Sequence, residues 1–256
     1  MKYKKLSIDE QIDLIKSKNI AVSDESKKQL NNVNYYNLMS FKNIFYENKD
    51  FHEYKQNLKL SDFYSLYQID SEIKKELLFS FQLLKNQLIK RIIDLFKNNF
   101  FEKDYLKDSL HKTNIIIEIY NNSLNKGFEC QTYYNTHSFL PIWVLLNEME
   151  YSQFIDYIES FNFKQYKKAF QGIKIEDLHS TKIWFEKVIS GNRIYDFSYK
   201  NTNINNILKI LKRFDINIEN ICLQYKKIYL DIPIIKKEDV LNITGIKEEY
   251  LNEQNQ

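Results

Sequence analysis

The stretch from Asp70 to Asn98, DSEIKKELLFSFQLLKNQLIKRIIDLFKN, decides the fold of this chain. Its apolar side chains recur every three or four residues, at Ile73, Leu77, Phe81, Leu84, Leu88, Ile92 and Leu95. This spacing is that of one face of an α-helix. We therefore predict one long helix over these residues, and it is the clearest element of the sequence.

The rest of the composition favours the same class of structure. The 256 residues include only 4 Gly and 2 Pro, whereas β-sandwiches and barrels need many tight turns, which these residues supply. The chain is 43% hydrophobic and 28% charged, which is typical of a globular protein. We predict an all-α, multi-helix bundle in which most of the Tyr and Phe rings are buried or half-buried.

Capping residues and apolar spacing locate the other helices. Ser7 and Glu10 form a capping box, which begins a first helix. The polar stretches 47–60 and 125–136 are expected to be loops, and Pro141 is expected near the first turn of its helix. The further helices are expected over about 8–17, from 23 or 24, 35–41, 104–124, 137–149, 151–160, 163–170, 175–190, 203–214 and 218–229, with a small pair in 236–249 broken at Gly245.

These elements suggest one compact domain with a small C-terminal helical appendage. Its parts would be an N-terminal helical region over 1–60, a helical core over 61–230 and the appendage over 231–256.

Charge and cysteine content exclude several classes of protein. The net charge of +3 is too balanced to indicate nucleic-acid binding by itself, so such a surface would have to be a local patch. Cys130 and Cys222 have neither metal-ligand spacing nor a disulfide framework, which suggests buried thiols in a reducing cytoplasm. We find no signal peptide, no apolar stretch of membrane-spanning length, no phosphate loop and no zinc motif, and we expect no metal or cofactor.

Four phrases in order resemble the bacterial abortive-infection (Abi) family of the AbiD and AbiF type. Residues 6–41 resemble the family opening, a "sxeeQixxLxxxGl" helix followed by "nYyrLsgY". Residues 66–92 resemble its "D-xx-LR" helix, which continues into "iExxlRs", and residues 137–161 resemble "PxWvxxExxsfgxlsxlyxxL". The last phrase, WFEKVISGNRIYDF at 184–197, lies where the family has "lRNxcAHxxRLyn". The resemblance covers about residues 5–215.

This resemblance implies a helical fold related to HEPN domains. Many HEPN domains are metal-independent ribonucleases with an Arg followed, after four to six residues, by a His. In those enzymes the His acts as general acid and base, and the Arg stabilises the phosphate. The resemblance also implies a role in antiphage defence, and some relatives pair with an antitoxin or a structured small RNA.

The catalytic motif is degenerate in this chain. Aligning Arg193 and Tyr195 with the family's "RLy" places Ser190 at the position of the His. A serine hydroxyl does not titrate near neutral pH, so it cannot replace an imidazole in acid–base catalysis. In the "iExxlRs" phrase, Asn86 takes the place of the Glu and Lys90 that of the Arg, which loses the bidentate geometry of a guanidinium.

Two residues are left as candidates for catalysis. Arg193 keeps the family position, and His179 is the nearest histidine in the sequence, although it lies six residues before Phe185. The alternative is structural: Arg193 would sit beyond a helix C-terminus that Gly191 caps, and Tyr195 would belong to the core.

Two local excesses of basic residues suggest an RNA-binding groove. Residues 74–97 hold six Lys and Arg against two acidic residues, and residues 160–200 hold eight against four. RNA would be held there by charge and by stacking on Tyr. Solvated lysine faces in a lysine-rich chain are the alternative. The candidate RNA-binding residues are Lys85, Asn86, Lys90, Arg91, Lys187, Asn192, Arg193 and Tyr195.

The leading hypothesis is therefore a cytoplasmic, abortive-infection-type antiphage protein that binds RNA and has lost or altered the usual ribonuclease centre. An active metal-independent endoribonuclease with a shifted centre, acting as a toxin, is a second reading. A protein-binding helical partner subunit is a third. A homodimer or heterodimer is compatible with each of them, and the sequence does not identify the RNA or the phage trigger.

Overall fold

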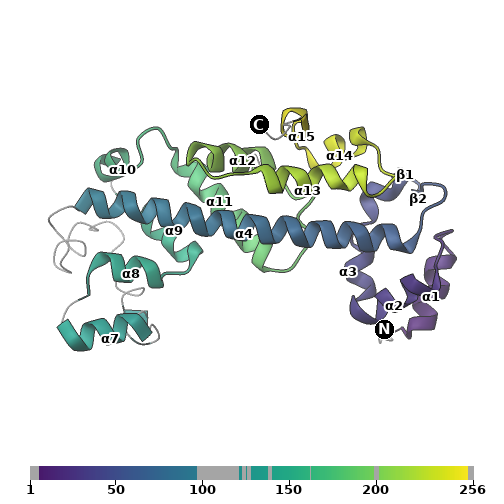
Figure 1. Cartoon of the computed structure of the whole chain (residues 1–256), viewed down its shortest axis with the longest axis horizontal. Coiled ribbons are helices and arrows are strands. Elements are labelled where there is room, and N and C mark those ends of the chain that lie inside the picture. The colour runs from purple at the N-terminus through teal and green to yellow at the C-terminus, as the bar shows by residue number, and fades with distance from the viewer. Residues whose placement is uncertain are drawn as a thin grey trace. The chain divides into compact units, whose positions relative to one another are not determined.

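The computed structural model describes residues 6–96, 121–122, 125, 128–137, 140–161, 163–198 and 202–252. Most of these residues lie in α-helices and the one sheet is a short two-stranded hairpin, which confirms the predicted all-α bundle (Figure 1). The chain divides into two compact units. Unit 1 contains residues 1–77, 191–205 and 218–256, and unit 2 contains residues 78–190 and 206–217. The three parts expected from the sequence, 1–60, 61–230 and 231–256, stay a prediction.

Three short helices open unit 1, as predicted. They are α1 (Ile8–Lys16), α2 (Asp24–Asn32) and α3 (Tyr35–Met39). The capping box of α1 is confirmed: the Glu10 amide donates to Ser7 Oγ over 3.2 Å, and the Glu10 carboxylate accepts from the Ser7 amide over 2.7 Å. Such a box pairs two backbone amides that have no partner within the helix.

A short hairpin follows within the stretch predicted to be a loop. A 3₁₀ turn, η1 (Lys42–Phe45), leads into β1 (Tyr46–Asn48), which pairs antiparallel with β2 (Glu53–Tyr54). The prediction of a loop over 47–60 is therefore wrong in part. A strand pair of this length carries almost no alternation of apolar and polar residues, so the pattern of the sequence did not indicate it.

The long helix α4 (Leu60–Phe96) runs through both units and starts ten residues earlier than predicted. Leu60, Phe63 and Leu66 are fully buried at its start, and the Asp62 carboxylate accepts from the Lys59 amide over 2.8 Å. This interaction holds the first turn of the helix. The predicted apolar face is confirmed, because the side chains of Ile73, Leu77, Phe81, Leu84, Leu88 and Ile92 are all fully buried.

The end of the chain completes unit 1. Helix α13 (Glu219–Leu230) contacts α14 (Lys237–Thr244) and α15 (Glu248–Asn252), and α14 contacts η1. The predicted break at Gly245 is confirmed by its φ of 68°, a left-handed conformation that ends α14. The side chain of Asn205 holds this turn, since it donates to the Gly245 carbonyl over 2.7 Å and accepts from the Lys247 amide over 2.9 Å.

Unit 2 contains the second half of α4 and the following helices. The helices predicted at 151–160, 163–170 and 175–190 are confirmed, and Pro141 lies at the N-cap of α8 rather than within its first turn. The described elements after α4 are α7 (Phe128–His137), α8 (Ile142–Glu148), α9 (Tyr151–Glu159), α10 (Phe163–Ala169), α11 (Ile175–Ile189) and most of α12 (Ile204–Arg213).

The predicted loop at 125–136 is wrong, because most of it forms α7. Its sequence is polar and has no amphipathic pattern, which is why periodicity missed it. It is placed by its contact with α8 and by the burial of Cys130. The helix predicted over 104–124 lies almost entirely outside the described residues.

Helices α9 and α11 form the best-packed pair of unit 2. The ring of Tyr151 stacks on Phe185 at 4.8 Å between centroids and lies 5.4 Å from Phe81 of α4. The Tyr151 hydroxyl is bonded to Thr181 Oγ1 over 2.8 Å. Burial of this ring raises the pKa of Tyr151 well above its usual value. Aromatic packing thus joins α4, α9 and α11.

The side chains of Cys130 and Cys222 are both buried, and neither forms a disulfide among the described residues. In the part of the chain that the structure describes, no helix combines the length and the apolar character that crossing a bilayer requires.

One lysine of unit 2 is part of the core. Lys85 is only 6% exposed, and its ammonium donates to the carbonyl oxygens of Asn147 over 3.0 Å and Met149 over 2.5 Å. These carbonyls lie at the C-terminal end of α8, where helix carbonyls have no partner within the helix. Burial lowers the pKa of Lys85, while the charge of nearby Glu148 acts in the opposite direction.

We expect Lys85→Ala to lower the free energy of unfolding by about 1–3 kcal/mol, because it leaves buried carbonyl groups without a donor. Lys90→Ala, at an exposed position of the same helix, should change it by less than about 0.5 kcal/mol. Urea unfolding followed by circular dichroism measures both values. Equal effects of the two substitutions would show that Lys85 does not hold α8.

Candidate nucleic-acid interface

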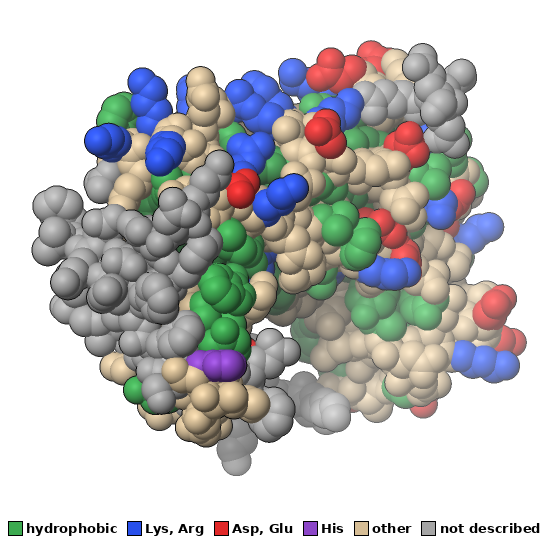
Figure 2. Space-filling view, turned by 60° about the vertical axis from the view of Figure 1, so that its left-hand side comes forward, with side chains coloured by type: hydrophobic (Ala, Val, Ile, Leu, Met, Phe, Trp, Pro, Cys, Tyr) green, Lys and Arg blue, Asp and Glu red, His purple; other side chains and the backbone are tan. Residues whose placement is uncertain are grey.

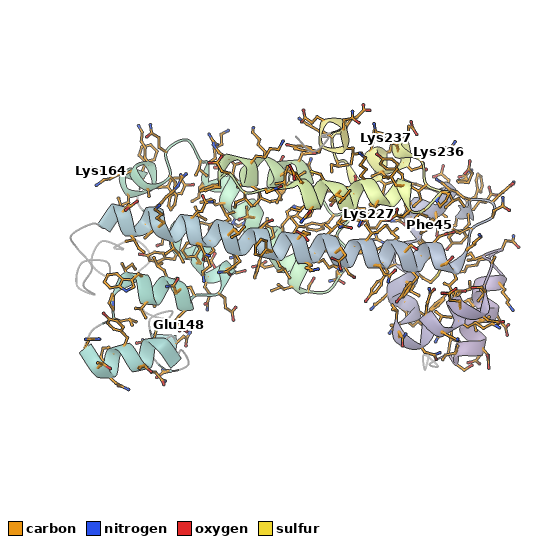
Figure 3. All side chains as sticks on the ribbon, viewed as in Figure 1. Phe45, Glu148, Lys164, Lys227, Lys236 and Lys237 are labelled. Carbon is orange, nitrogen blue, oxygen red and sulfur yellow. The ribbon has the colours of Figure 1, made fainter. Side chains whose placement is uncertain are left out.

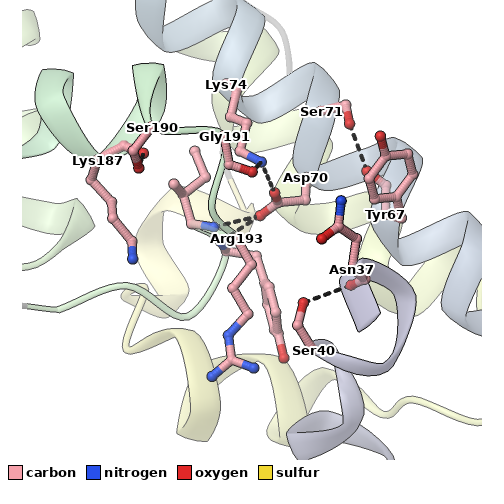
Figure 4. A network of polar contacts seen from close by, with 12 residues as sticks. Asn37, Ser40, Tyr67, Asp70, Ser71, Lys74, Lys187, Ser190, Gly191 and Arg193 are labelled. Carbon is pink, nitrogen blue, oxygen red and sulfur yellow. Dashed lines mark hydrogen bonds and ion pairs between the residues drawn. The ribbon is translucent and has the colours of Figure 1, made fainter. Parts of the chain in front are cut away.

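The segment after α11 is fixed to α4 by one buried carboxylate (Figure 4). Oδ1 of Asp70 accepts from the amides of Ile194, over 2.8 Å, and Tyr195, over 2.7 Å. Its other oxygen, Oδ2, lies 2.8 Å from the ammonium of Lys74, one turn further along α4. That ammonium also donates to the Gly191 carbonyl over 3.3 Å. Because Asp70 is fully buried, these donors take the place of water around its charge.

This arrangement gives the Arg193-Ile194-Tyr195 phrase a structural role. Tyr195 is fully buried, and its ring stacks on Phe41 with centroids 5.6 Å apart. Burial raises the pKa of Tyr195 far above its usual value, so its hydroxyl stays protonated. Tyr195 belongs to the core of unit 1, as the structural alternative from the sequence expected, and it offers no surface for stacking a base.

Arg193 is partly exposed and already has an acidic partner. Its Nε donates to Oδ1 of Asp196 over 3.1 Å. Burial raises the pKa of Asp196, and the Arg193 guanidinium opposes this shift. Gly191 has a φ of 73°, a left-handed conformation that suits the end of α11. The guanidinium therefore neutralises a half-buried carboxylate beside the turn.

The candidate histidine lies in unit 2 and has a separate partner. His179 Nδ1 is 2.7 Å from Oε1 of Glu159, in a pair that links α11 to α9. Ser190, which takes the family's His position, donates through its hydroxyl to the Lys187 carbonyl over 2.7 Å. Lys187 itself is half-buried. Arg193 and His179 thus belong to different compact units.

The other candidate RNA-binding residues are differently exposed. The ammonium of Lys85 is hydrogen-bonded to carbonyls at the end of α8, as described above, so its charge does not lie on the surface. Asn86, Lys90 and Asn192 are exposed, and Asn86 Oδ1 accepts from Gln82 over 3.2 Å.

Arg91 is half-buried, and its guanidinium lies 4.5 Å from the ring centroid of Phe214, a cation–π geometry. The Phe214 carbonyl accepts from the Gln87 side chain over 2.7 Å, so the end of α12 is held against α4.

A cavity of about 430 Å³ lies beside Arg91. Arg91, Asp94 and Leu95 line it from the end of α4. Lys168, Ala169 and Gln171 line it from the end of α10 and the turn that follows.

A third element adjoins the same turn. A side chain at Gly172 would place its Cβ 3.2 Å from the guanidinium of Arg213, so Arg213 of α12 lies against this glycine. Three segments of unit 2 thus bring Arg91, Lys168 and Arg213 to one region.

The neighbouring residues extend this region as a positive surface. Lys164 and Lys167 of α10 are exposed, as is Lys90 of α4. Figure 2 shows Lys and Arg side chains gathered at the upper left, on the side where α10 lies, and Figure 3 marks Lys164 on that helix. The basic surface is defined as Lys90, Arg91, Lys164, Lys167, Lys168 and Arg213.

The charges of this surface are largely uncompensated. Among the described residues, none of its six members takes part in a salt bridge. Residues 160–174 include no Asp or Glu, and the same is true of 197–214. Asp94 is the acidic residue that lines the cavity. A surface of this kind attracts polyanions.

The roles of Asp70, Lys168 and Arg213 were not predicted from the sequence. Asp70 and Lys74 form an acidic–basic pair four residues apart in the long helix predicted from the sequence, and this spacing could have identified them. Lys168 was counted in the basic excess but not singled out. Arg213 lies outside both basic stretches, so only the folded chain brings it to the surface.

The chemistry of this surface is electrostatic. Guanidinium and ammonium groups bind phosphate oxygens, and the planar fork of Arg can do so with two hydrogen bonds. None of its six members is a His or a carboxylate that could transfer a proton near neutral pH. In the described part of the chain, no three His, Cys, Asp or Glu side chains are grouped so as to hold a metal ion.

Comparison with known families gives one informative match. Residues 28–190 match the family model described as Abi-like protein, which is more than half of the chain. The match includes α4 through α11 and ends at Ser190, before Arg193. No curated protein and no solved structure matches the chain.

We expect Asp70→Ala to lower the free energy of unfolding by about 3–5 kcal/mol, because it leaves two amides and the Lys74 ammonium without their acceptor. Asp70→Asn should cost less, since its amide oxygen can still accept from the amides of Ile194 and Tyr195. Chemical denaturation measures stability, and hydrogen exchange of these two amides reports the local effect.

Glu72→Ala is the matched control on the same helix. Its exposed pair with Lys75 should contribute less than about 1 kcal/mol. Unchanged exchange at Ile194 and Tyr195 in Asp70→Ala would contradict the assigned role of Asp70.

Proposed function

This chain belongs to the Abi-like protein family, and we propose from this premise that it is an abortive-infection-type defence protein that binds RNA through the basic surface of unit 2. The observation that carries the RNA proposal is that Arg91 and Lys168 line one cavity and that Arg213 lies against Gly172, in the turn beside it. A relation to HEPN domains, which the sequence resemblance implies, is part of the same proposal.

The proposed ligand is the phosphate backbone of RNA. Backbone contacts by Lys and Arg give affinity without sequence specificity, and each contact releases counterions. Arg91 is held over Phe214 and Gln87 holds the adjoining carbonyl, so this guanidinium is positioned before RNA binds. A pre-positioned donor loses less entropy on binding.

The residues at positions 190 and 193 favour RNA binding without RNA cleavage. Ser190 stands where the family has its His, and the Arg193 guanidinium is paired with Asp196. Growth arrest would then follow from sequestering an RNA or from presenting it to a partner. The partner could be a second copy of this chain or another subunit, and dimer formation stays a prediction.

We expect Arg91→Glu combined with Lys168→Glu to weaken RNA binding by about tenfold or more, since the double substitution removes two charge-assisted hydrogen bonds of about 1.5–3 kcal/mol each. Fluorescence anisotropy with a labelled single-stranded RNA of mixed sequence measures the affinity. The dependence of log affinity on log salt concentration should become shallower by about 0.7 for each phosphate that is no longer neutralised.

Lys75→Glu is the matched control for charge reversal, because Lys75 is an exposed lysine of α4 that belongs to unit 1. It should leave RNA affinity within about twofold if binding is local to the basic surface. Absence of binding by the unaltered protein at low salt would overturn the proposal.

Metal-independent RNA cleavage is a second candidate function. It is favoured by the His179–Glu159 pair, because a carboxylate that holds an imidazole is the arrangement of a general base. We expect His179→Ala to abolish any cleavage seen in the presence of EDTA while leaving RNA affinity unchanged. Cleavage that survives in His179→Ala would exclude this centre, and cleavage lost only in Arg193→Ala would favour a centre at Arg193.

A further inference from the structure

Unit 1 contains a larger cavity that no part of the proposed function uses. It is an open cleft of about 920 Å³, within the range of about 300–1,000 Å³ that is usual for ligand sites. Lys18 and Asn19, which follow α1, form one wall, η1 contributes a second, and the β1–β2 hairpin with the chain leading to α4 forms the rest.

Backbone hydrogen bonds fix the walls of this cleft. Ala21 and Lys59 form an isolated bridge, in which the Ala21 amide donates to the Leu58 carbonyl over 2.9 Å. The Lys55 amide donates to the Phe45 carbonyl over 2.9 Å and so ties the end of the hairpin to η1. The walls are therefore set by the main chain rather than by flexible side chains.

Left-handed backbone conformations occur repeatedly around the cleft. Asn19 has a φ of 60°, His52 of 54° and Asn57 of 60°, and all three residues line it. Such conformations are uncommon outside glycine and occur preferentially at ligand sites. Among the described residues, Asp215 is the one other non-glycine residue with a positive φ.

Aromatic rings form one side of the cleft. Tyr46 lies between its two neighbours, with its ring centroid 4.9 Å from Tyr54 and 5.4 Å from His52. Tyr54 is half-buried, and burial raises its pKa far above the usual value. The ring of His52 is tilted by 35° to that of Tyr46, and His52 is exposed, so a planar ligand can reach its ring.

Cationic and amide side chains line the remainder of the cleft. Lys42 is exposed and Lys18 is half-exposed, and neither forms a salt bridge within the described residues. Lys55 differs from them, because its ammonium is paired with Asp239 and also bonded to the Ile234 carbonyl. The side chains available to a ligand are therefore two ammonium groups beside an aromatic stack.

We propose that this cleft binds a nucleotide. The base would stack on the ring of His52, and the phosphates would lie against Lys18 and Lys42. The amides of Asn19 and Asn57 can pair with the edge of a base, and the Glu53 carboxylate can accept from ribose hydroxyls. A simple anion would use only the two lysines and leave most of the cleft empty.

The bound base, ribose and phosphates could belong to a free nucleotide or to the end of a single-stranded RNA. Isothermal titration calorimetry of the full chain with ATP tests the first source, and a 5′-phosphorylated RNA trinucleotide tests the second. Saturable binding of either supports the site if it weakens by about tenfold or more in Lys42→Glu and in His52→Ala.

Lys49→Glu is the matched control, because Lys49 is exposed in the same hairpin and does not line the cleft. Circular dichroism shows whether each variant is folded, and His52→Ala preserves the test if Lys42→Glu is not. The Arg91→Glu, Lys168→Glu variant should bind the nucleotide normally, which separates this site from the RNA surface of unit 2.

Three results would overturn the proposal. The first is absence of binding by ATP and by the trinucleotide at millimolar concentration. The second is binding that Lys42→Glu and His52→Ala both leave unchanged. The third is tripolyphosphate binding as tightly as ATP, which would show that the aromatic stack takes no part.

Discussion

The Asp70 carboxylate is the interaction on which the rest of unit 1 depends. Two consecutive backbone amides, Ile194 and Tyr195, point at one of its oxygens, and Lys74 balances its charge. A carboxylate without these partners would be costly to bury, and the two amides would be costly to bury without the carboxylate. Each part thus makes the burial of the other possible. The stacking of Tyr195 on Phe41 then joins α3, α4 and the chain after α11 into one core.

The same contacts give each residue of the Arg193-Ile194-Tyr195 phrase a structural role. The main chain of the phrase is bound by Asp70, the tyrosine fills the core, and the arginine balances Asp196. None of these roles needs an acid–base group nearby. Packing and hydrogen bonds alone can therefore account for the position of this segment.

Much of the helical architecture could be predicted because burial imposes a spacing of three or four residues. Every apolar position predicted for the face of α4 from Ile73 to Ile92 is buried. Prediction failed where that spacing was absent or obscured. Helix α7 has no apolar face. The first turns of α4 do have the spacing, at Leu60, Phe63 and Leu66, but the polar residues between them obscured it. The hairpin is too short to have a pattern of its own.

The candidate site was less predictable, because a sequence shows which residues are charged but not how deeply each side chain is buried. Lys85 and Lys90 are equivalent in a count of basic residues, yet one is internal and the other exposed. Arg213 adjoins Gly172 only after α10 and α12 have folded. The cleft of unit 1 is assembled from three short segments, and no single segment has a recognisable motif.

The discontinuous make-up of unit 1 has a consequence for synthesis on the ribosome. Its first 77 residues emerge early, but the amides that bind Asp70 belong to residues 194 and 195, and α13 to α15 come later still. Contacts so distant in sequence form only when both partners have been translated. The first helices of unit 1 can therefore complete their packing only after these later residues have been made. A nascent chain carries the Asp70 side chain without its amide partners until 124 further residues have been made.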